Sequence, residues 1–234
     1  RLGSIVVGNT YRNPAVLLKQ AVTVDHVSGG RVVLGLGAGW QENEHIAYGL
    51  DYPGTKGRLD RLDEACQVVQ LLKRNERATF AGQHYRLVDA PLSPKPVGPL
   101  PLMVGGGGEK RTLRTTAQWA DEWNVWSDPP LFTRKHAILR QHCDAIGRDA
   151  GEIVTSTNAL LFLSTDEHWL AQFRDRDMGR PVIVGTPAEV AEIVAAYAAA
   201  GVDELILPDF TMPDPIRKRE MFDLFITEVA PAFR

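Results

Sequence analysis

The stretch Ser28-Gly29-Gly30-Arg31-Val32-Val33-Leu34-Gly35-Leu36-Gly37-Ala38-Gly39-Trp40 predicts a turn, a buried strand and a glycine-rich exit from that strand. The continuous apolar run from Val32 to Leu34 is typical of a parallel strand that is covered on both faces. Gly35, Gly37 and Gly39 alternate, so they lie on one side of the pleat. Two interpretations remain open: a flat ligand lies against the bare backbone, or another part of the barrel or sheet packs closely there.

Strand and helix patterns alternate on both sides of this stretch. Before it, Leu2 to Val7 predicts a strand, and Asn13 with Pro14 predicts an N-cap and a first helical residue. That helix is expected to end at Gly29. After the stretch, a long loop from Gln41 to Gly57 precedes an amphipathic helix, and a loop of this length in a compact domain is usually functional.

The chain as a whole predicts six strand-then-helix units in a single domain over residues 1–234, and no pattern indicates a hairpin. Residues 79–101 hold five prolines and are expected to be irregular. Strict alternation implies a parallel sheet, either doubly wound or a (β/α)8 barrel that lacks two units. Both architectures bind ligands at the carboxyl ends of their strands. The expected strands are Leu2–Val7, Val32–Gly39, Leu102–Val104, Glu122–Trp126, Ile153–Leu163 and Leu205–Leu207.

Composition narrows the classes of partner and compartment. The chain has 234 residues, 44% of them hydrophobic, and a net charge of −3 with scattered basic residues, which argues against nucleic acid or an anionic membrane as the partner. No apolar run is long enough to span a bilayer, and no signal-peptide pattern is present. Cys66 and Cys143 both fall on apolar faces of predicted helices, and no metal-ligand spacing occurs. We therefore expect a cytoplasmic protein without a metal site.

The sequence Gly105-Gly106-Gly107-Gly108-Glu109-Lys110 follows a predicted strand and is expected to open a helix. Backbone N–H groups at a helix start bind oxyanions, and the helix dipole favours negative charge. Arg111 or Arg114 would add a salt link. The spacing matches neither a Walker motif nor a dinucleotide fingerprint. We favour a phosphate site here over a flexible tight turn, because the strand–glycine–helix context is the one that such a site requires.

A second group of polar residues, Trp40-Gln41-Glu42-Asn43-Glu44-His45, follows the central strand. Asn43, Glu44 and His45 are the catalytic candidates, with His45 as a proton carrier near neutral pH. The alternative is that these residues cap a helix or face solvent. Further upstream, Asp25 is expected to pair with Arg31.

Four motifs, in this order, resemble the bacterial luciferase-like monooxygenase superfamily, and most closely its actinobacterial branch that uses the deazaflavin coenzyme F-420. The motifs are Leu2 to Pro14, Asp25 to Trp40, Arg58 to Ala65, and Gly105 to Arg111. The resemblance implies a (β/α)8 TIM-type barrel that binds a flavin-like ring at the carboxyl ends of its strands. It also implies a non-prolyl cis peptide between Ile5 and Val6.

When the family's binding positions are transferred to this sequence, the residues expected near the flavin-like ring of the cofactor and its side chain are Gly8, Asn9, Thr10, Gly37, Ala38, Gly39 and Trp40. The resemblance assigns the cofactor phosphate to Gly106, Gly107, Gly108 and Glu109. The cofactor performs the hydride chemistry, while the protein orients it and excludes water.

Two departures from the family pattern limit the carry-over. The sugar-phosphate dehydrogenase branch of the family has an acidic residue at the position where this chain has Trp40. Sugar-phosphate dehydrogenase activity is therefore not expected. The family's first two strands, which supply an acidic residue and a histidine beside the reactive carbon, have no counterpart, so the chain resembles a barrel shortened to about six units. The sequence therefore predicts an F-420-dependent oxidoreductase, a homo-oligomer acting on a small organic substrate. The alternatives are an FMN-dependent monooxygenase and a non-catalytic barrel fragment.

Overall fold

The computed structural model describes residues 1–210 and 214–233, whose contacts divide the chain into two compact units. Unit 1 comprises Arg1–Asn124 and Ile138–Ile153, and unit 2 comprises Val125–Ala137 and Val154–Arg234. The chain passes from unit 1 into unit 2 within the strand β7 (Glu122–Trp126) and returns within the helix α5 (Pro129–Asp144).

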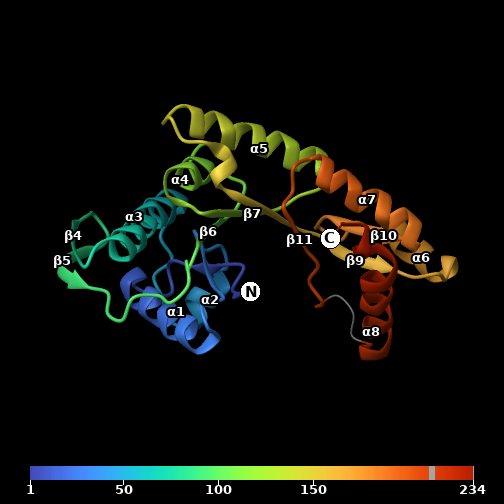
Figure 1. The fold of residues 1–234 in the computed structure, drawn as a ribbon, viewed down its shortest axis with the longest axis horizontal. Coiled ribbons are helices and arrows are strands. Elements are labelled where there is room, and N and C mark those ends of the chain that lie inside the picture. The colour runs from blue at the N-terminus through green and yellow to red at the C-terminus, as the bar shows by residue number, and fades with distance from the viewer. Residues whose placement is uncertain (211–213, 234) are drawn as a thin grey trace. The chain divides into compact units, whose positions relative to one another are not determined.

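Unit 1 is built on a parallel sheet. Its strands are β1 (Leu2–Gly3), β2 (Val7–Gly8), β3 (Val32–Gly37), β6 (Leu102–Gly105) and the first residues of β7 (Figure 1). Both β1 and β2 pair with β3, β3 pairs with β6, and β6 pairs with β7, all in parallel. The predicted parallel α/β architecture is therefore confirmed in this unit, and every residue of β3 is buried.

The first predicted strand is divided in two. Leu2–Gly3 and Val7–Gly8 both run beside β3, and the peptide bond between Ile5 and Val6 is cis, as the family resemblance implied. The single strand expected over Leu2 to Val7 is thus wrong in detail, because the residues between its two halves do not pair with β3 and include one residue more than the stretch of β3 opposite them.

The first helix of unit 1 begins and ends at the predicted caps. The helices of this unit are α1 (Pro14–Ser28), α2 (Glu42–Ala47), α3 (Thr55–Arg74) and α4 (Thr112–Trp119), followed later by a 3₁₀ turn at Ala150–Glu152. At the start of α1, Asn13 accepts a hydrogen bond from the Ala15 N–H at 2.9 Å, and Gly29 ends the helix with a φ of 70°. Buried apolar side chains of α1, α3, β3 and β6 form one core that includes Leu18, Leu36 and Leu62.

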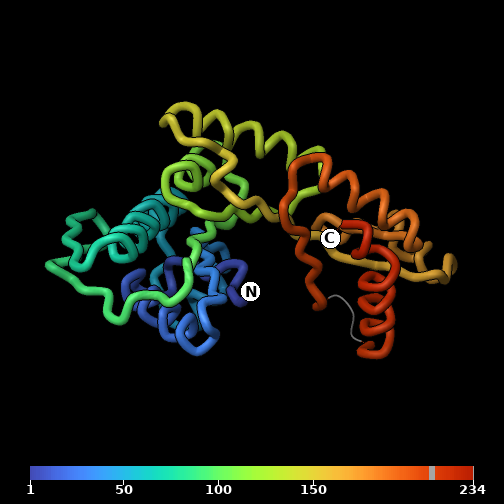
Figure 2. The backbone as a smooth tube through the Cα atoms, in the orientation of Figure 1, coloured from blue at the N-terminus to red at the C-terminus, as the bar shows by residue number. Residues whose placement is uncertain are grey.

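A hairpin in unit 1 contradicts the expectation that residues 79–101 are irregular throughout. The strands β4 (Arg77–Ala81) and β5 (Arg86–Pro91) pair in antiparallel fashion, and the tube in Figure 2 shows their turn. The carboxylate of Glu64 on α3 accepts the N–H groups of Gln83 at 2.7 Å and His84 at 2.9 Å in that turn. The hairpin depends on this distant carboxylate, so local sequence pattern did not predict it.

Asp25 also differs from expectation. Its fully buried carboxylate accepts the backbone N–H groups of Val97 at 2.8 Å and Gly98 at 3.0 Å. Arg31, its predicted partner, donates instead from Nε to the Ser28 carbonyl at 2.8 Å. The carboxylate therefore fixes a proline-rich segment against the end of α1.

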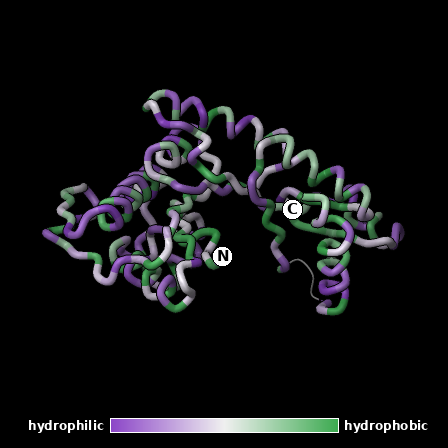
Figure 3. Tube along the Cα trace, viewed as in Figure 1, coloured by the Kyte–Doolittle hydropathy of each residue, from purple (hydrophilic) through white to green (hydrophobic). Residues whose placement is uncertain are grey.

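Unit 2 contains β8 (Val154–Asn158), β9 (Leu160–Leu163), β10 (Val182–Gly185) and β11 (Glu204–Ile206). Parallel pairs join β8 to β11 and β9 to β10, so the strand predicted over Ile153 to Leu163 is two strands with different partners. Figure 3 colours β9 and β10 as hydrophobic, and β9 is buried throughout. The helical elements are α6 (Glu167–Arg174), α7 (Pro187–Ala199), α8 (Pro215–Leu224), a π-helical segment at Phe225–Val229 and a 3₁₀ turn at Ala230–Phe233.

The start of α7 carries a capping box formed by Thr186 and Glu189. The Glu189 carboxylate accepts the Thr186 N–H at 2.8 Å and the Thr186 hydroxyl at 3.0 Å. Elsewhere, Cys66 and Cys143 are both buried free cysteines. Among the described residues, no helix combines the length and apolar character that crossing a bilayer requires.

Candidate functional site

The carboxyl ends of three neighbouring strands bring the predicted cofactor residues to one edge of the unit 1 sheet. Gly8 at the end of β2 pairs with Gly37 at the end of β3, and Leu36 pairs with Val104 of β6. Gly8, Asn9 and Thr10, the segment Gly37 to Trp40, and the turn after Gly105 therefore begin at the same edge. This edge is the place where parallel sheets bind ligands.

The glycines of β3 make room for the chain itself. A Cβ on Gly37 would lie 2.6 Å from Cγ2 of Val6, and one on Gly35 would overlap the Ser4 carbonyl oxygen. Gly105 of β6 faces the same side chain, since its Cβ would lie 2.7 Å from Val6 Cγ2. Of the two open interpretations, close packing of the chain is correct at these positions. The cofactor assignment of Gly37 remains a prediction, but the interpretation that a ligand occupies this space is wrong.

His45 of α2 lies at the centre of a polar and aromatic cluster beside this edge. It is fully buried, its Nδ1 lies 2.6 Å from the Gln41 carbonyl oxygen, and its Nε2 lies 2.7 Å from the Thr10 hydroxyl. Its ring stacks on Tyr11 at 4.8 Å between centroids and contacts Tyr52 at 4.7 Å. Both ring nitrogens are therefore engaged: Nδ1 is bound within the segment after β3, and Nε2 holds that segment to the loop after β2.

The other two catalytic candidates have different surroundings. Glu44 is half-buried and accepts a hydrogen bond of 2.6 Å from the Tyr11 hydroxyl, which raises the pKa of Tyr11 to about 12, with a smaller contribution from burial. Asn43 is exposed, and so is Trp40. Glu44 and His45 thus link the loop after β3 to Thr10 and Tyr11, while a catalytic role for any of the three remains a prediction.

Asn9 is a buried residue with one unused polar atom. Its Nδ2 donates to the carbonyl oxygens of Gly37 at 3.2 Å and Arg58 at 3.3 Å, whereas Oδ1 has no donor among the described residues. Buried acceptors without a donor are rare in folded proteins and call for an explanation. The predicted cofactor residue Asn9 therefore holds a buried acceptor that no described group satisfies.

Arg58 is a structural member of the site that sequence reasoning did not single out. Its Nε donates to the Gly39 carbonyl at 3.1 Å, one Nη donates to the Pro53 carbonyl at 2.7 Å, and the guanidinium lies over the Tyr52 ring at 4.2 Å. The sequence signal that would have found it is its place in the first turn of the helix that follows a long loop. Arg58 ties the carboxyl end of β3 to the start of α3.

The turn after β6 has free backbone donors. Gly106 has a φ of 123° and donates its N–H to the Asn124 carbonyl at 2.9 Å. The N–H groups of Gly107 and Gly108 donate to no acceptor in the part of the chain that the structure describes. The helix α4 begins at Thr112, so the expectation that it opens directly after the glycines is wrong by several residues. The free amides are therefore presented by a loop.

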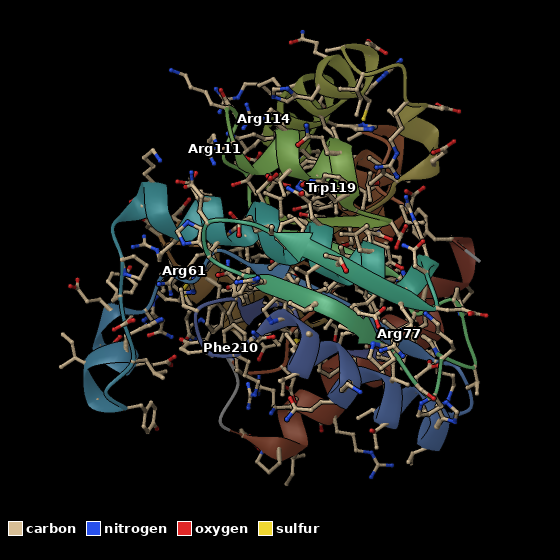
Figure 4. The ribbon with its side chains drawn as sticks, turned by 90° about the vertical axis from the view of Figure 1, so that its left-hand side faces the viewer. Arg61, Arg77, Arg111, Arg114, Trp119 and Phe210 are labelled. Carbon is tan, nitrogen blue, oxygen red and sulfur yellow. The ribbon has the colours of Figure 1, made fainter. Side chains whose placement is uncertain are left out.

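Basic side chains flank this turn at the start of α4 (Figure 4). Arg111 pairs with Asp60 at 2.6 Å, and hydrogen bonds from Lys56 and then Arg111 lower the pKa of Asp60 to about 2. Arg114 is exposed, and no ion pair to it occurs within the described residues. Of the two arginines that the sequence proposed for a salt link, Arg111 is already engaged and Arg114 is available.

A separate cavity of about 360 Å³ lies in unit 2 and contains none of the predicted site residues. It is lined by Leu163, Ser164, Thr165, Asp166, Arg217, Glu220, Met221 and Leu224.

Comparison with known proteins places this geometry in context. A family model described as luciferase-like monooxygenase matches residues 1–173. An F-420-dependent glucose-6-phosphate dehydrogenase of Kineococcus radiotolerans is 28% identical over an alignment that covers 100% of this chain and 78% of that protein.

Solved structures share the fold. The coenzyme F-420-dependent tetrahydromethanopterin reductase of Methanopyrus kandleri superposes with a TM-score of 0.83 at 20% identity, covering 100% of this chain and 83% of the other. A monooxygenase from Streptomyces bottropensis superposes with a TM-score of 0.81 at 16% identity, covering 98% of this chain and 77% of the other. The expectation of a luciferase-like, TIM-type α/β fold is confirmed by these likenesses.

Proposed function

Because the chain belongs to the luciferase-like monooxygenase family, we propose that it is an F-420-dependent oxidoreductase that transfers a hydride between the deazaflavin and a small organic substrate. Names among its relatives support this choice of cofactor, since the relative from Kineococcus radiotolerans and the structural neighbour from Methanopyrus kandleri are both named as F-420-dependent.

The observation that carries the proposal is the convergence of unused hydrogen-bonding groups at one sheet edge. Among the described residues, Asn9 Oδ1 after β2 has no donor, and the N–H groups of Gly107 and Gly108 after β6 have no acceptors. The strands β2, β3 and β6 are consecutive neighbours in the sheet. Such an edge matches a ligand with hydrogen-bond donors on one part and an anionic group on another.

The residues present fit an F-420-like cofactor on both counts. Gly107 and Gly108 would hold its phosphate through their free N–H groups, and Asn9 and Thr10 would contact its ring system or side chain. When bound, the cofactor supplies the hydride chemistry. The chain's own part is to hold the loops after β2 and β3 together through His45, Glu44 and Arg58.

For the substrate, we propose a small organic molecule other than glucose 6-phosphate. Trp40 is 70% exposed at the end of β3, where the sugar-phosphate dehydrogenase branch is expected to have an acid. An exposed indole offers an apolar surface in place of a charge. This argument favours an uncharged or apolar substrate over a sugar phosphate.

Binding and turnover of F-420 by the purified chain test the proposal. We expect oxidised F-420 to bind at least about tenfold more tightly than FMN, measured by quenching of cofactor fluorescence. Reduced F-420 should then be oxidised by members of a panel of small ketones and aldehydes, with glucose 6-phosphate and oxidised F-420 as the comparison reaction. Preferential binding of FMN would favour the monooxygenase alternative, and binding of neither cofactor would favour a non-catalytic protein.

A further inference from the structure

The hydrogen bonds of His45 fix the direction of the bond that it shares with Thr10. A carbonyl oxygen can only accept, so the contact of 2.6 Å between Nδ1 and the Gln41 carbonyl requires the proton of the neutral imidazole on Nδ1. In the neutral imidazole Nε2 is then bare, and it accepts the hydrogen bond of 2.7 Å from the Thr10 hydroxyl. The hydroxyl proton of Thr10 is therefore directed to His45.

Thr10 consequently faces the rest of the site with lone pairs alone. A hydroxyl group has one proton and two lone pairs, and here the proton is already used. Thr10 is half-buried at the end of β2, so a ligand at the sheet edge can reach it. A ligand hydroxyl or N–H group would find an acceptor there, whereas a ligand carbonyl would find no donor.

Asn9 offers the same polarity for an independent reason. Two carbonyl oxygens, of Gly37 and Arg58, lie within hydrogen-bond distance of one end of its side-chain amide, so that end must be the NH2 group. The oxygen at the other end is buried and has no donor among the described residues. Asn9 and Thr10 are thus consecutive residues that both present acceptors.

We propose that Asn9 and Thr10 form an acceptor-only pair that recognises an N–H or O–H group of the ligand, and that His45 is the positioning residue that makes Thr10 an acceptor. The proposal rests on the proposed function for the location of the ligand. It adds the polarity of recognition at this point and assigns His45 a role through Thr10. His45 was predicted from the sequence as a proton carrier, and its two engaged nitrogens favour positioning instead.

Binding of oxidised F-420 to four single variants and one double variant tests this assignment. His45→Phe keeps a ring between Tyr11 and Tyr52 but loses both hydrogen bonds, whereas His45→Gln can still donate to Gln41 and accept from Thr10. Thr10→Val removes the hydroxyl at similar volume, and Thr10→Ser retains it. We expect His45→Phe and Thr10→Val each to raise the dissociation constant about tenfold, and His45→Gln and Thr10→Ser to stay within about threefold of the unmodified chain.

The double variant with His45→Phe and Thr10→Val separates positioning from general structural damage. If His45 acts through Thr10, the double variant should bind no worse than Thr10→Val alone, because the hydroxyl that His45 orients is absent. Additive losses, or failure of His45→Gln to restore binding, would overturn the inference while F-420 binding itself persists.

A second measurement on the free protein needs no cofactor. The 15N chemical shifts of the His45 ring at neutral pH should show a protonated Nδ1 and a bare Nε2, and Thr10→Val should leave Nδ1 protonated. The opposite tautomer would overturn the inference directly. Absence of F-420 binding to the unmodified chain would instead overturn the proposed function, so the two failures are distinguishable.

Discussion

The glycines of β3 and the glycines that follow β6 lie at the same edge of the sheet and serve opposite purposes. In β3, the space beside Gly35 and Gly37 is filled by Ser4 and Val6 of the chain's own first segment. In the turn after β6, Gly107 and Gly108 present backbone N–H groups that no described residue accepts. The two stretches have similar composition, yet one is packed and the other is open.

This difference teaches where a glycine-rich motif is informative. A glycine in a strand uses its N–H and C=O groups in the ladder, so only the missing side chain can matter, and any neighbouring segment can fill that space. A glycine in a loop after a strand leaves its N–H group free, and an anion is the usual partner for several such groups together. Whether its backbone N–H group already has an acceptor therefore distinguishes a glycine that allows close packing from one that can bind an anion.

The largest effect is expected from a side chain added on the packed side. Gly35→Ala would place a methyl group against the Ser4 carbonyl oxygen and 2.9 Å from Val6 Cγ1. Both neighbours lie on a segment paired to β3, so the backbone must shift. We expect a loss of about 3 kcal/mol in the free energy of unfolding, measured by chemical denaturation.

Gly54→Ala is the matched control for this variant. A Cβ on Gly54 meets nothing within 4 Å, and its φ of −56° suits alanine. Its stability should stay within about 0.5 kcal/mol of the unmodified chain. Equal stability of the two variants would contradict the view that the strand glycines exist for packing.

A charge placed on the open side should affect binding and leave folding intact. Gly107→Asp would put a carboxylate beside the free N–H groups of the turn, where it competes with and repels a phosphate. We expect the dissociation constant of F-420 to rise by at least about tenfold, with little change in the melting temperature. Gly107→Asn has nearly the same shape without the charge and should lose less affinity. Unchanged affinity in Gly107→Asp would refute the phosphate assignment.

The contrast also marks what local sequence can predict. The caps at Asn13 and Gly29 were predicted correctly, because each depends on residues within a few positions of itself. The hairpin of β4 and β5 was missed, because the Glu64 carboxylate that holds its turn comes from α3.

The site shows the same division. Residues at the sheet edge were predicted from strand ends and from family resemblance, and β2, β3 and β6 do bring them together. The space beside Gly37 is filled by Val6, which is distant from Gly37 in the sequence. Sequence alone therefore left two interpretations open. The partners of Asn9 and His45 depend on tertiary contacts in the same way.

The contribution of the ion pair between Asp60 and Arg111 to the stability of the fold should depend on pH. Hydrogen bonds from Lys56 and Arg111 lower the pKa of Asp60 from 3.8 to about 2 in the folded chain. A lowered pKa stabilises the fold above the unfolded value, and this contribution is lost as the pH falls from about 4 to about 2. Asp60→Asn should therefore be less stable than the unmodified chain at pH 6, by less than about 1 kcal/mol, and the gap should close on acidification.

Asp223→Asn is the control for that pH dependence. Asp223 lies 3.5 Å from Arg219, and the side chain of Asp223 is 66% exposed and that of Arg219 84% exposed. Removal of the charge of Asp223 should therefore change the free energy of unfolding little at any pH. A gap between Asp60→Asn and the unmodified chain that is as large at pH 2 as at pH 6 would mean that Asp60 acts by packing, without its charge.

The smallest expected effect concerns the hydrogen bond from Tyr11 to Glu44, which joins the loops after β2 and β3. The hydrogen bond from Tyr11 to the Glu44 carboxylate is the main cause that raises the pKa of Tyr11 from 10.0 to about 12. Glu44→Gln keeps an oxygen that can accept but removes the charge, so the pKa of Tyr11 should move part of the way back toward 10.0. NMR of tyrosines labelled at Cζ reports each titration separately. Tyr197 is the internal control, because burial alone is the main cause of its pKa of about 12, and Glu44→Gln should leave it unchanged. If the pKa of Tyr11 did not move, the charge of Glu44 would not be engaged in holding the two loops together. The carboxylate would then be free to act as the predicted catalytic group.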